Sequence, residues 1–298
     1  MLRPMIGLLA RLSALVPFLG RRERHPLVAV VRLHGAIGSV GIGRGGLSLT
    51  GSARDLEAAF TMRGVKCVAL SINSPGGSPV QSNLIYRRIR SLVEEHGVPV
   101  LAFCEDAAAS GGYWLACAGD EIYADPNSIV GSIGVVSGGF GFPALLAKLG
   151  VERRLYVQGE NKGMLDAFSP ERPSDVEHLH GIQKVVHDSF KALVRERRGD
   201  RLKEEESKLF TGAFWTGTQA LGLGLVDGLG DLRGVMRARY GDKVRLKVVG
   251  RSPNRLRLLL GRGTETPTGS LSAGSLAELP EAALRALEAR WLWARLGL

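Results

Sequence analysis

Continuous apolar runs alternate with segments of helical periodicity over the first third of the chain. The runs are residues 27–33 (LVAVVRL), 66–72 (KCVALSI) and 98–104 (VPVLAFC). They are apolar along most of their length rather than at every second position, which is typical of strands buried on both faces. Residues 53–62 and 79–95 lie between them and carry apolar residues at helical spacing. This order predicts an α/β fold with a mostly parallel sheet and helices outside.

The second half of the chain predicts more helix. Short apolar segments at 121–124 and 153–157 are expected to add strands. The pattern Ser174-x-x-Glu177 is a capping box that opens a helix to about Arg198, and Thr216-x-x-Gln219 is a second one.

The 298 residues divide by composition into four parts. We expect one folded domain over residues 27–250, preceded by a basic, apolar tail or anchor at 1–26. A segment rich in Ser, Thr, Gly and Pro at 251–275 is typical of a linker, and 276–298 has the pattern of an amphipathic helix.

Most of the net charge of +10 lies at the two ends. Residues 1–26 hold five arginines and one glutamate (+4), and residues 251–298 hold seven arginines and four acids (+3). A nucleic-acid-binding domain concentrates positive charge on its folded body, so no nucleic-acid partner is expected. Basic and apolar ends fit an anionic membrane surface, with solvated tails as the alternative.

The apolar stretch near the N-terminus is short for a membrane span. Residues 5–20 are interrupted by Arg11 and Pro17, whereas a spanning helix needs about 20 apolar residues. No small-residue cleavage site precedes the basic cluster at 21–24. We therefore expect a membrane-associated or soluble protein whose body is cytoplasmic.

Three cysteines, Cys67, Cys104 and Cys117, stand singly in apolar runs. An odd number in such surroundings predicts reduced, packed thiols and no disulfide framework. Their spacing does not form a metal-ligand pattern, and neither a metal ion nor an organic cofactor is expected.

Two glycine motifs follow neighbouring predicted strands. Residues 73–77 (NSPGG) come after the second strand, and residues 107–114 (AAASGGYW) come after the third. Backbone N–H groups at such strand ends can face a ligand. Each motif alone is compatible with a plain turn, and Ser110 with a simple helix cap. Together they favour an oxyanion pocket beside Ser110.

A serine nucleophile needs a base. His178, His180 and His187 lie on the predicted helix from 174 and are expected to form a solvated face. His34 ends the first strand and lacks an evident acidic partner. Lys162, in a glycine-flanked loop, is the other candidate, because burial favours the neutral amine that a base requires.

Five pieces of the chain, in order, resemble the signal peptide peptidase A (protease IV) family of serine peptidases. That family has a crotonase/Clp-protease-like fold, built from repeated β-β-α-type units. The matching pieces are residues 71–77 (SINSPGG), 107–114 (AAASGGYW), 127–135 (NSIVGSIGV), the loop around Lys162, and residues 215–227.

The resemblance implies a serine endopeptidase with a Ser–Lys dyad. Its nucleophile falls on Ser110, its base on Lys162, and the serine that hydrogen-bonds the lysine on Ser132. The oxyanion donors fall on the N–H groups of Gly77 and Gly111. The implied reaction hydrolyses peptide bonds of apolar or signal-peptide-like segments through an acyl-enzyme.

The chain holds one copy of the catalytic domain, so it resembles the short form of the family. The resemblance then implies a ring-shaped homo-oligomer in which Lys162 meets Ser110 of a neighbouring copy.

Two alternatives remain open. A crotonase-like acyl-CoA enzyme would place paired glutamates at the pocket, but the acids of residues 107–135 are Asp120, Glu121 and Asp125. A catalytically idle membrane scaffold would leave Ser110 and Lys162 unexplained.

Overall fold

The computed structural model describes residues 25–38, 46–250 and 290–298. Within these ranges eight strands form one sheet: β1 (Leu27–His34), β2 (Val65–Ser74), β3 (Val100–Ala109), β4 (Glu121–Ala124), β5 (Ile129–Gly131), β6 (Phe214–Thr216), β7 (Gly228–Leu229) and β8 (Arg245–Val249). Their order is β6-β5-β3-β2-β1-β8, with β4 pairing β3 and β7. The strand pairs are parallel except β5 with β6. The predicted fold class is therefore confirmed.

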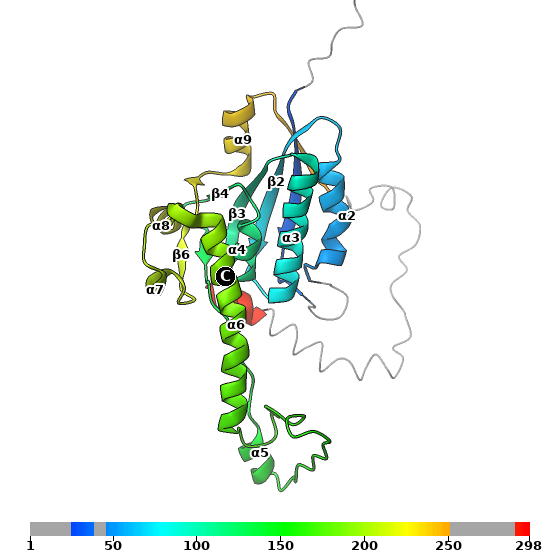
Figure 1. Cartoon of the computed structure of the whole chain (residues 1–298), viewed down its shortest axis with the longest axis vertical. Helices are drawn as coiled ribbons and strands as arrows, with labels where there is room; N and C mark the ends of the chain where they lie inside the picture. Colours follow the sequence, from blue (N-terminus) through cyan, green and yellow to red (C-terminus); the bar gives the residue numbers. More distant parts are fainter. Residues whose placement is uncertain (1–24, 39–45, 251–289) are drawn as a thin grey trace, which may run out of the picture.

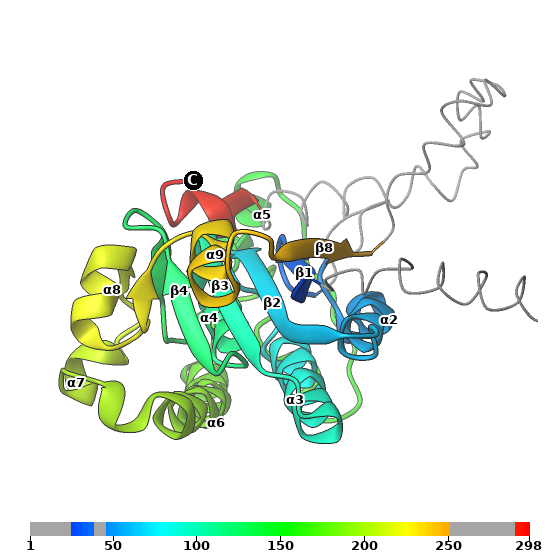
Figure 2. The same ribbon diagram turned by 90° about the horizontal axis from the view of Figure 1, so that it is seen from above.

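Helices cover both faces of the sheet. They are α2 (Leu49–Phe60), α3 (Pro79–His96), α4 (Gly111–Ala116), α5 (Pro143–Lys148), α6 (Pro173–Arg198), α7 (Glu206–Leu209), α8 (Gly217–Leu223) and α9 (Leu232–Tyr240), with a 3-10 turn η2 at Gly199–Arg201. Helices α3, α4 and α6 lie on one face, whereas α9 and the C-terminal segment lie on the other (Figures 1 and 2).

The central strands are apolar throughout because both of their faces are buried. In β1, Val31 and Leu33 belong to the core under α2, α3, α4 and α6. The alternate residues Val28 and Val30 pack with Met236 of α9. Burying each such side chain contributes about 1.5–3 kcal/mol, so both layers stabilise the sheet.

The expected strand at 153–157 is wrong. These residues form no strand, all are exposed, and Tyr156 is 90% exposed. They lie in the connection between α5 and α6, which projects from the body at the far end of α6 (Figure 1). A β-type segment becomes a strand only beside another strand, and the sheet does not reach this place.

One predicted capping box is confirmed and the other is wrong. At α8 the Thr216 Oγ1 accepts a hydrogen bond from the N–H of Gln219, and the Gln219 Oε1 accepts one from the N–H of Thr216. Helix α6 begins at Pro173, with Arg172 in the cap position and without a side-chain cap bond. Proline at the first helical position starts this helix before the expected cap residue.

The end segments are described only in part. The proposed anchor at 1–26 and the linker at 251–275 lie almost wholly outside the described residues, as does the tail helix before residue 290. Residues 290–294 are helical. Within the described ranges, no helix has the length and hydropathy to cross a membrane.

The C-terminal end of α6 is fixed by a buried ion pair. Arg198, which is 2% exposed, lies with its Nη1 2.7 Å from Asp227 Oδ2. The Arg198 Nε and Nη2 also donate to the Gly224 carbonyl, and Asp227 accepts from the N–H of Ile122 in β4. Burial alone would raise the pKa of Asp227, but the hydrogen bond and charge of Arg198 hold this pKa below its ordinary value. The pair therefore joins α6 to the edge of the sheet.

The carboxyl ends of β2 and β3 approach too closely for side chains. Gly76, after β2, has a φ of +102°. A Cβ placed there would lie 2.8 Å from the Ser110 Cβ and 2.9 Å from the Gly111 nitrogen. A Cβ on Gly112 would lie 2.5 Å from the Ser74 carbonyl oxygen. Glycine is therefore required on both sides of this crossing.

We expect Asp227→Asn to lower the free energy of unfolding by about 3 kcal/mol at pH 7, because it leaves the Arg198 charge buried without a counter-ion. Urea denaturation measures this change. The pKa of Asp227 is lowered in the folded state, so its contribution is present above the unfolded carboxyl pKa and disappears as the pH falls through the folded value. The difference between variant and wild type should therefore shrink below about pH 4.

The control is Asp242→Asn, since Asp242 is 83% exposed in its pair with Arg237 and should contribute under about 1 kcal/mol. Equal losses of unfolding free energy in Asp227→Asn and Asp242→Asn would show that the buried Arg198–Asp227 pair has no special stabilising role.

We expect Gly76→Ala to lower the thermal midpoint by about 4–10 °C, because it adds both a clash and an unfavourable φ costing roughly 2–3 kcal/mol. Differential scanning calorimetry measures the midpoint. Gly138→Ala is the matched control, since a Cβ there meets nothing within 4 Å. A Gly76→Ala midpoint equal to that of the control would show that the crossing tolerates a side chain.

Candidate active site

Ser110 occupies a strained position between β3 and α4. Its φ of 52° and ψ of −121° are unusual for a residue with a side chain. Such strain costs about 1–3 kcal/mol and is found mainly at functional sites. The surrounding backbone enforces it, because the Ser110 N–H donates to the Gly131 carbonyl at 2.8 Å. The serine is therefore held at the sheet's carboxyl edge by β5.

The Ser110 hydroxyl does not cap the helix that it precedes. Ser110 stands at the cap position of α4, but its side chain makes no cap bond. Its carbonyl accepts from the N–H groups of Tyr113 and Trp114 at 2.9 and 3.0 Å. The half-buried hydroxyl bonds to no described residue, so it is available for chemistry. The simple-cap interpretation of this serine does not agree with this geometry.

Two backbone N–H groups lie beside this hydroxyl without acceptors among the described residues. They belong to Gly77 and to Gly111, the first residue of α4, where helix N–H groups lack intrahelical partners. Gly77 is placed by the segment after β1, since Ile37 donates to the Gly76 carbonyl and accepts from the N–H of Ser78, both at 2.8 Å.

Ser110, Gly77 and Gly111 line one small cavity of about 20 Å³. The rest of its wall is largely apolar: Pro79, Trp114, Gly134, Val135, Val186 and Phe190. The structure thus brings together three of the five predicted site residues, from two neighbouring strand ends. A hydroxyl beside two free N–H donors and an apolar wall can take a carbonyl group.

Ser132 directly follows β5 and does not itself line this cavity. Its φ of 53° is also strained, and the residue is 2% exposed. Its N–H donates to the Ala213 carbonyl at 2.7 Å, and its Oγ accepts from Arg295 Nη2 at 3.0 Å. Sequence analysis missed Arg295, which is 163 residues away from Ser132, and no local pattern could have found it.

Lys162 is not at this cavity. It is exposed, it lies in the connection between α5 and α6, and it contacts neither Ser110 nor Ser132 in this chain. That connection projects at the far end of α6 (Figure 1). One copy of the chain therefore brings Ser110, Gly77 and Gly111 together without the expected base.

The histidines near the sheet have partners other than Ser110. His34 Nε2 lies 2.7 Å from Ser71 Oγ and 3.4 Å from Glu105 Oε2, so the expectation that it lacks an acidic partner is wrong. The sequence could not show this pairing. His34 lies on β1 and Glu105 on β3, and these two strands are brought near each other only by their shared neighbour β2. His187 is part-buried rather than solvated, and its Nε2 lies 3.2 Å from the Ile133 carbonyl oxygen.

The thiols are free and buried, as expected. Burial raises the pKa of Cys67, Cys104 and Cys117 to about 12, so each is protonated and unreactive at neutral pH. No group of three or more His, Cys, Asp and Glu side chains in the described residues could hold a metal ion.

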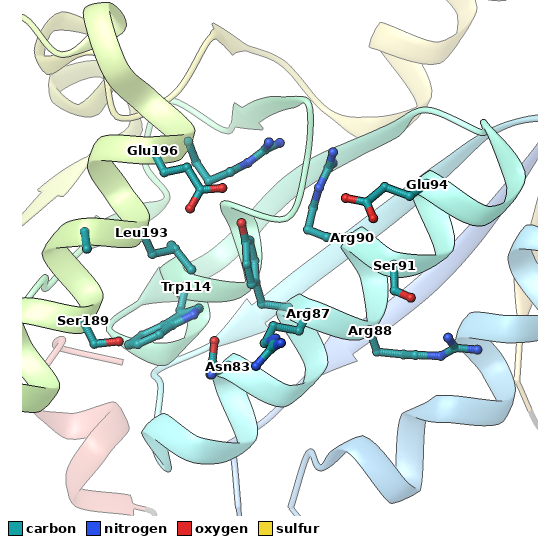
Figure 3. Close-up of a pocket in the computed structure, with 13 residues that line it drawn as sticks. Asn83, Arg87, Arg88, Arg90, Ser91, Glu94, Trp114, Ser189, Leu193 and Glu196 are labelled. Carbon is teal, nitrogen blue, oxygen red and sulfur yellow. The ribbon is translucent and has the colours of Figure 1, made fainter.

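A larger cavity of about 820 Å³ lies between α3 and α6 (Figure 3). Its Arg90 and Arg197 are already paired with Asp120, at 2.7 and 3.4 Å. Trp114, stacked on Phe190 with ring centroids 4.7 Å apart, lines both cavities. The larger cavity contains none of the predicted site residues.

Comparison with known proteins shows which family the chain is similar to. Residues 93–244, about half of the chain, match peptidase family S49. The chain is 32% identical over 216 residues to the chloroplastic serine protease SPPA of Arabidopsis thaliana, covering 69% of this chain and 31% of that protein. It is 53% identical over 276 residues to a Brucella abortus protein named Na(+)/H(+) antiporter NhaA, covering 91% of this chain and 37% of that protein.

The chain thus spans about a third of the length of these two relatives. Among solved structures, a mutant of the 1510-N membrane-bound stomatin-specific protease aligns with a TM-score of 0.47 and 15% identity, over 76% of this chain and 99% of that one. The expected enzyme class, a serine-type peptidase, is confirmed at the level of the family. The chain belongs to peptidase family S49.

Proposed function

We propose that this chain is a serine endopeptidase that uses Ser110 as its nucleophile. The observation that carries the proposal is the unused Ser110 hydroxyl, held on a strained backbone beside the free N–H groups of Gly77 and Gly111. Strain at a nucleophile and unpartnered donors beside it are costly features that a purely structural turn does not need.

In the proposed reaction the Ser110 Oγ attacks the carbonyl carbon of a peptide bond while the neutral amine of Lys162 takes the hydroxyl proton. The N–H groups of Gly77 and Gly111 stabilise the oxyanion, each donor contributing about 3–4 kcal/mol to the lowering of the barrier. The lysine then gives its proton to the leaving amine, and an acyl-enzyme remains. Water, deprotonated by the same lysine, attacks the ester and releases the carboxylate product and Ser110.

The wall of the small cavity favours apolar substrates. Val135, Val186, Phe190 and Pro79 line it together with Ser110, and no charged side chain of the described residues does so. A cavity of about 20 Å³ fits a small apolar side chain beside the cleaved bond. We propose apolar, signal-peptide-like segments as the substrate class.

A second copy of the chain is proposed to supply Lys162. The region between Val136 and Phe168, here called the arm, exposes many large apolar side chains: Val136, Phe140, Leu145, Leu149, Val151, Leu155, Tyr156, Val157, Leu165 and Phe168. Soluble proteins rarely leave such a surface uncovered. Since the arm and the serine site are different surfaces, their pairing is head-to-tail and closes into a ring when the rotation permits.

The crotonase-like alternative has less support. It requires acids at the cavity, and none of the acids in the described part of the chain lines it. Asp120 pairs with Arg90, Glu121 pairs with Arg239, and Asp125 accepts from the N–H of Asn127. An idle scaffold would not account for the strain at Ser110. Association with a membrane surface depends on residues 1–26 and stays a prediction.

We expect Ser110→Ala to abolish both cleavage of apolar fluorogenic peptides and labelling by a fluorophosphonate probe, because the attacking oxygen is removed. Ser189→Ala is the matched control, since this exposed serine lines the larger cavity. It should keep wild-type rates. Undiminished cleavage by Ser110→Ala would refute the nucleophile. Hydration of an enoyl-CoA thioester by the wild type, without peptide cleavage, would favour the crotonase-like alternative.

A mixing experiment tests the shared site. Ser110→Ala and Lys162→Ala should each be inactive alone. When they are co-expressed and purified together through two different tags, about a quarter of the sites in a randomly mixed ring combine an intact serine with an intact neighbouring lysine. We therefore expect about a quarter of wild-type activity.

Lys148→Ala is the control for the second variant, because Lys148 is an exposed lysine at the end of α5 in the same arm. It should be as active as wild type. Complete inactivity of the mixed assembly would show that serine and base do not come from different copies.

A further inference from the structure

The C-terminal segment packs against the strands that hold the serine site. Leu296, which is 6% exposed, lies against Ala107 and Ala109 of β3, and Trp293 and Ile129 complete the cluster. Figure 2 shows the segment on the sheet face opposite α3 and α6. This packing brings a residue near the end of the chain into reach of Ser132.

Arg295 is the residue that contacts the site. Its Nη2 donates to Ser132 Oγ at 3.0 Å, and its guanidinium lies 5.4 Å from the centroid of the Trp291 ring. Ser132 is almost completely buried, and its own O–H donates to no described residue. A hydroxyl oxygen that accepts from a guanidinium keeps its proton for another acceptor.

We propose that Arg295 is a positioning residue for the base of the peptidase. Its guanidinium turns the Ser132 hydroxyl so that the O–H donates to the amine nitrogen of Lys162 from the neighbouring copy. Only the neutral amine can accept such a bond, and a nearby positive charge further disfavours the ammonium form. Arg295 thereby keeps the lysine in the form that a general base requires. This inference rests on the proposed function.

Other charged or titratable groups on the elements around Ser132 have different partners. On β3, Glu105 is bonded to Ser71 and Asp106 to Asn73. On α6, His187 contacts the Ile133 carbonyl. Arg290 and the terminal carboxylate belong to the same segment as Arg295, without a bond to Ser132. Arg295 is thus the charged side chain that meets this hydroxyl within the described residues.

The test is the pH dependence of kcat/KM between pH 6 and 10 for wild type, Arg295→Ala, Arg295→Lys and Arg290→Ala. In Arg295→Ala we expect the midpoint of the rise in activity to move up by about one pH unit, which lowers the rate about tenfold at pH 7 and little at pH 10. Arg295→Lys keeps the charge and should stay near wild type. Arg290→Ala removes an equal charge from the same segment and should not shift the midpoint.

Two results would overturn the proposal. An unchanged pH midpoint of kcat/KM in Arg295→Ala would show that Arg295 does not act on the base. Higher activity of Arg295→Ala at neutral pH would indicate that Arg295 inhibits the enzyme by competing with Lys162 for Ser132. Peptide cleavage that persists in Ser110→Ala refutes the proposed function itself, whereas the results above leave it standing.

Discussion

The close crossing of two glycine-bearing turns at the carboxyl ends of β2 and β3 is the constraint on which the site depends. Since Gly76 leaves no space for a Cβ beside Ser110, the backbone of one turn packs directly against the other. The contact brings Gly77, Gly111 and Ser110 to the wall of one small cavity. The same arrangement forces Ser110 into a conformation that is stable only because β5 and α4 hold its backbone.

Helix α6 connects this site to the rest of the molecule. Its C-terminal end is fixed to the sheet by Arg198 and Asp227, and its middle supplies Val186 and Phe190 to the wall of the cavity. Its N-terminal end carries the arm beyond the body (Figure 1). A rigid helix that is fixed at one end and carries the arm at the other can hold Lys162 away from the Ser110 of its own chain and leave it accessible to another copy. Separation of the two residues within one chain is therefore a consequence of the fold.

The opposite face of the sheet contributes through the end of the chain. There the C-terminal segment covers Ala107 and Ala109 and brings Arg295 to Ser132. The serine site is thus contacted from both faces of the sheet, by α3, α4 and α6 on one side and by residues 290–298 on the other. In the proposed mechanism the first face binds substrate and the second tunes the base.

The sequence by itself determined the features that depend on near neighbours in the chain. Buried strands followed from continuous apolar runs, and the position of Ser110 between a strand and a helix followed from its glycine motif. Contacts between distant segments were decided by the tertiary structure, because local patterns carry no information about which strands become neighbours. For that reason His34 meets Glu105, Arg295 meets Ser132, and residues 153–157 form no strand where no sheet edge is available. Whether Lys162 reaches the Ser110 of another copy depends on how the arm packs, and a single copy leaves the apolar surface of the arm exposed.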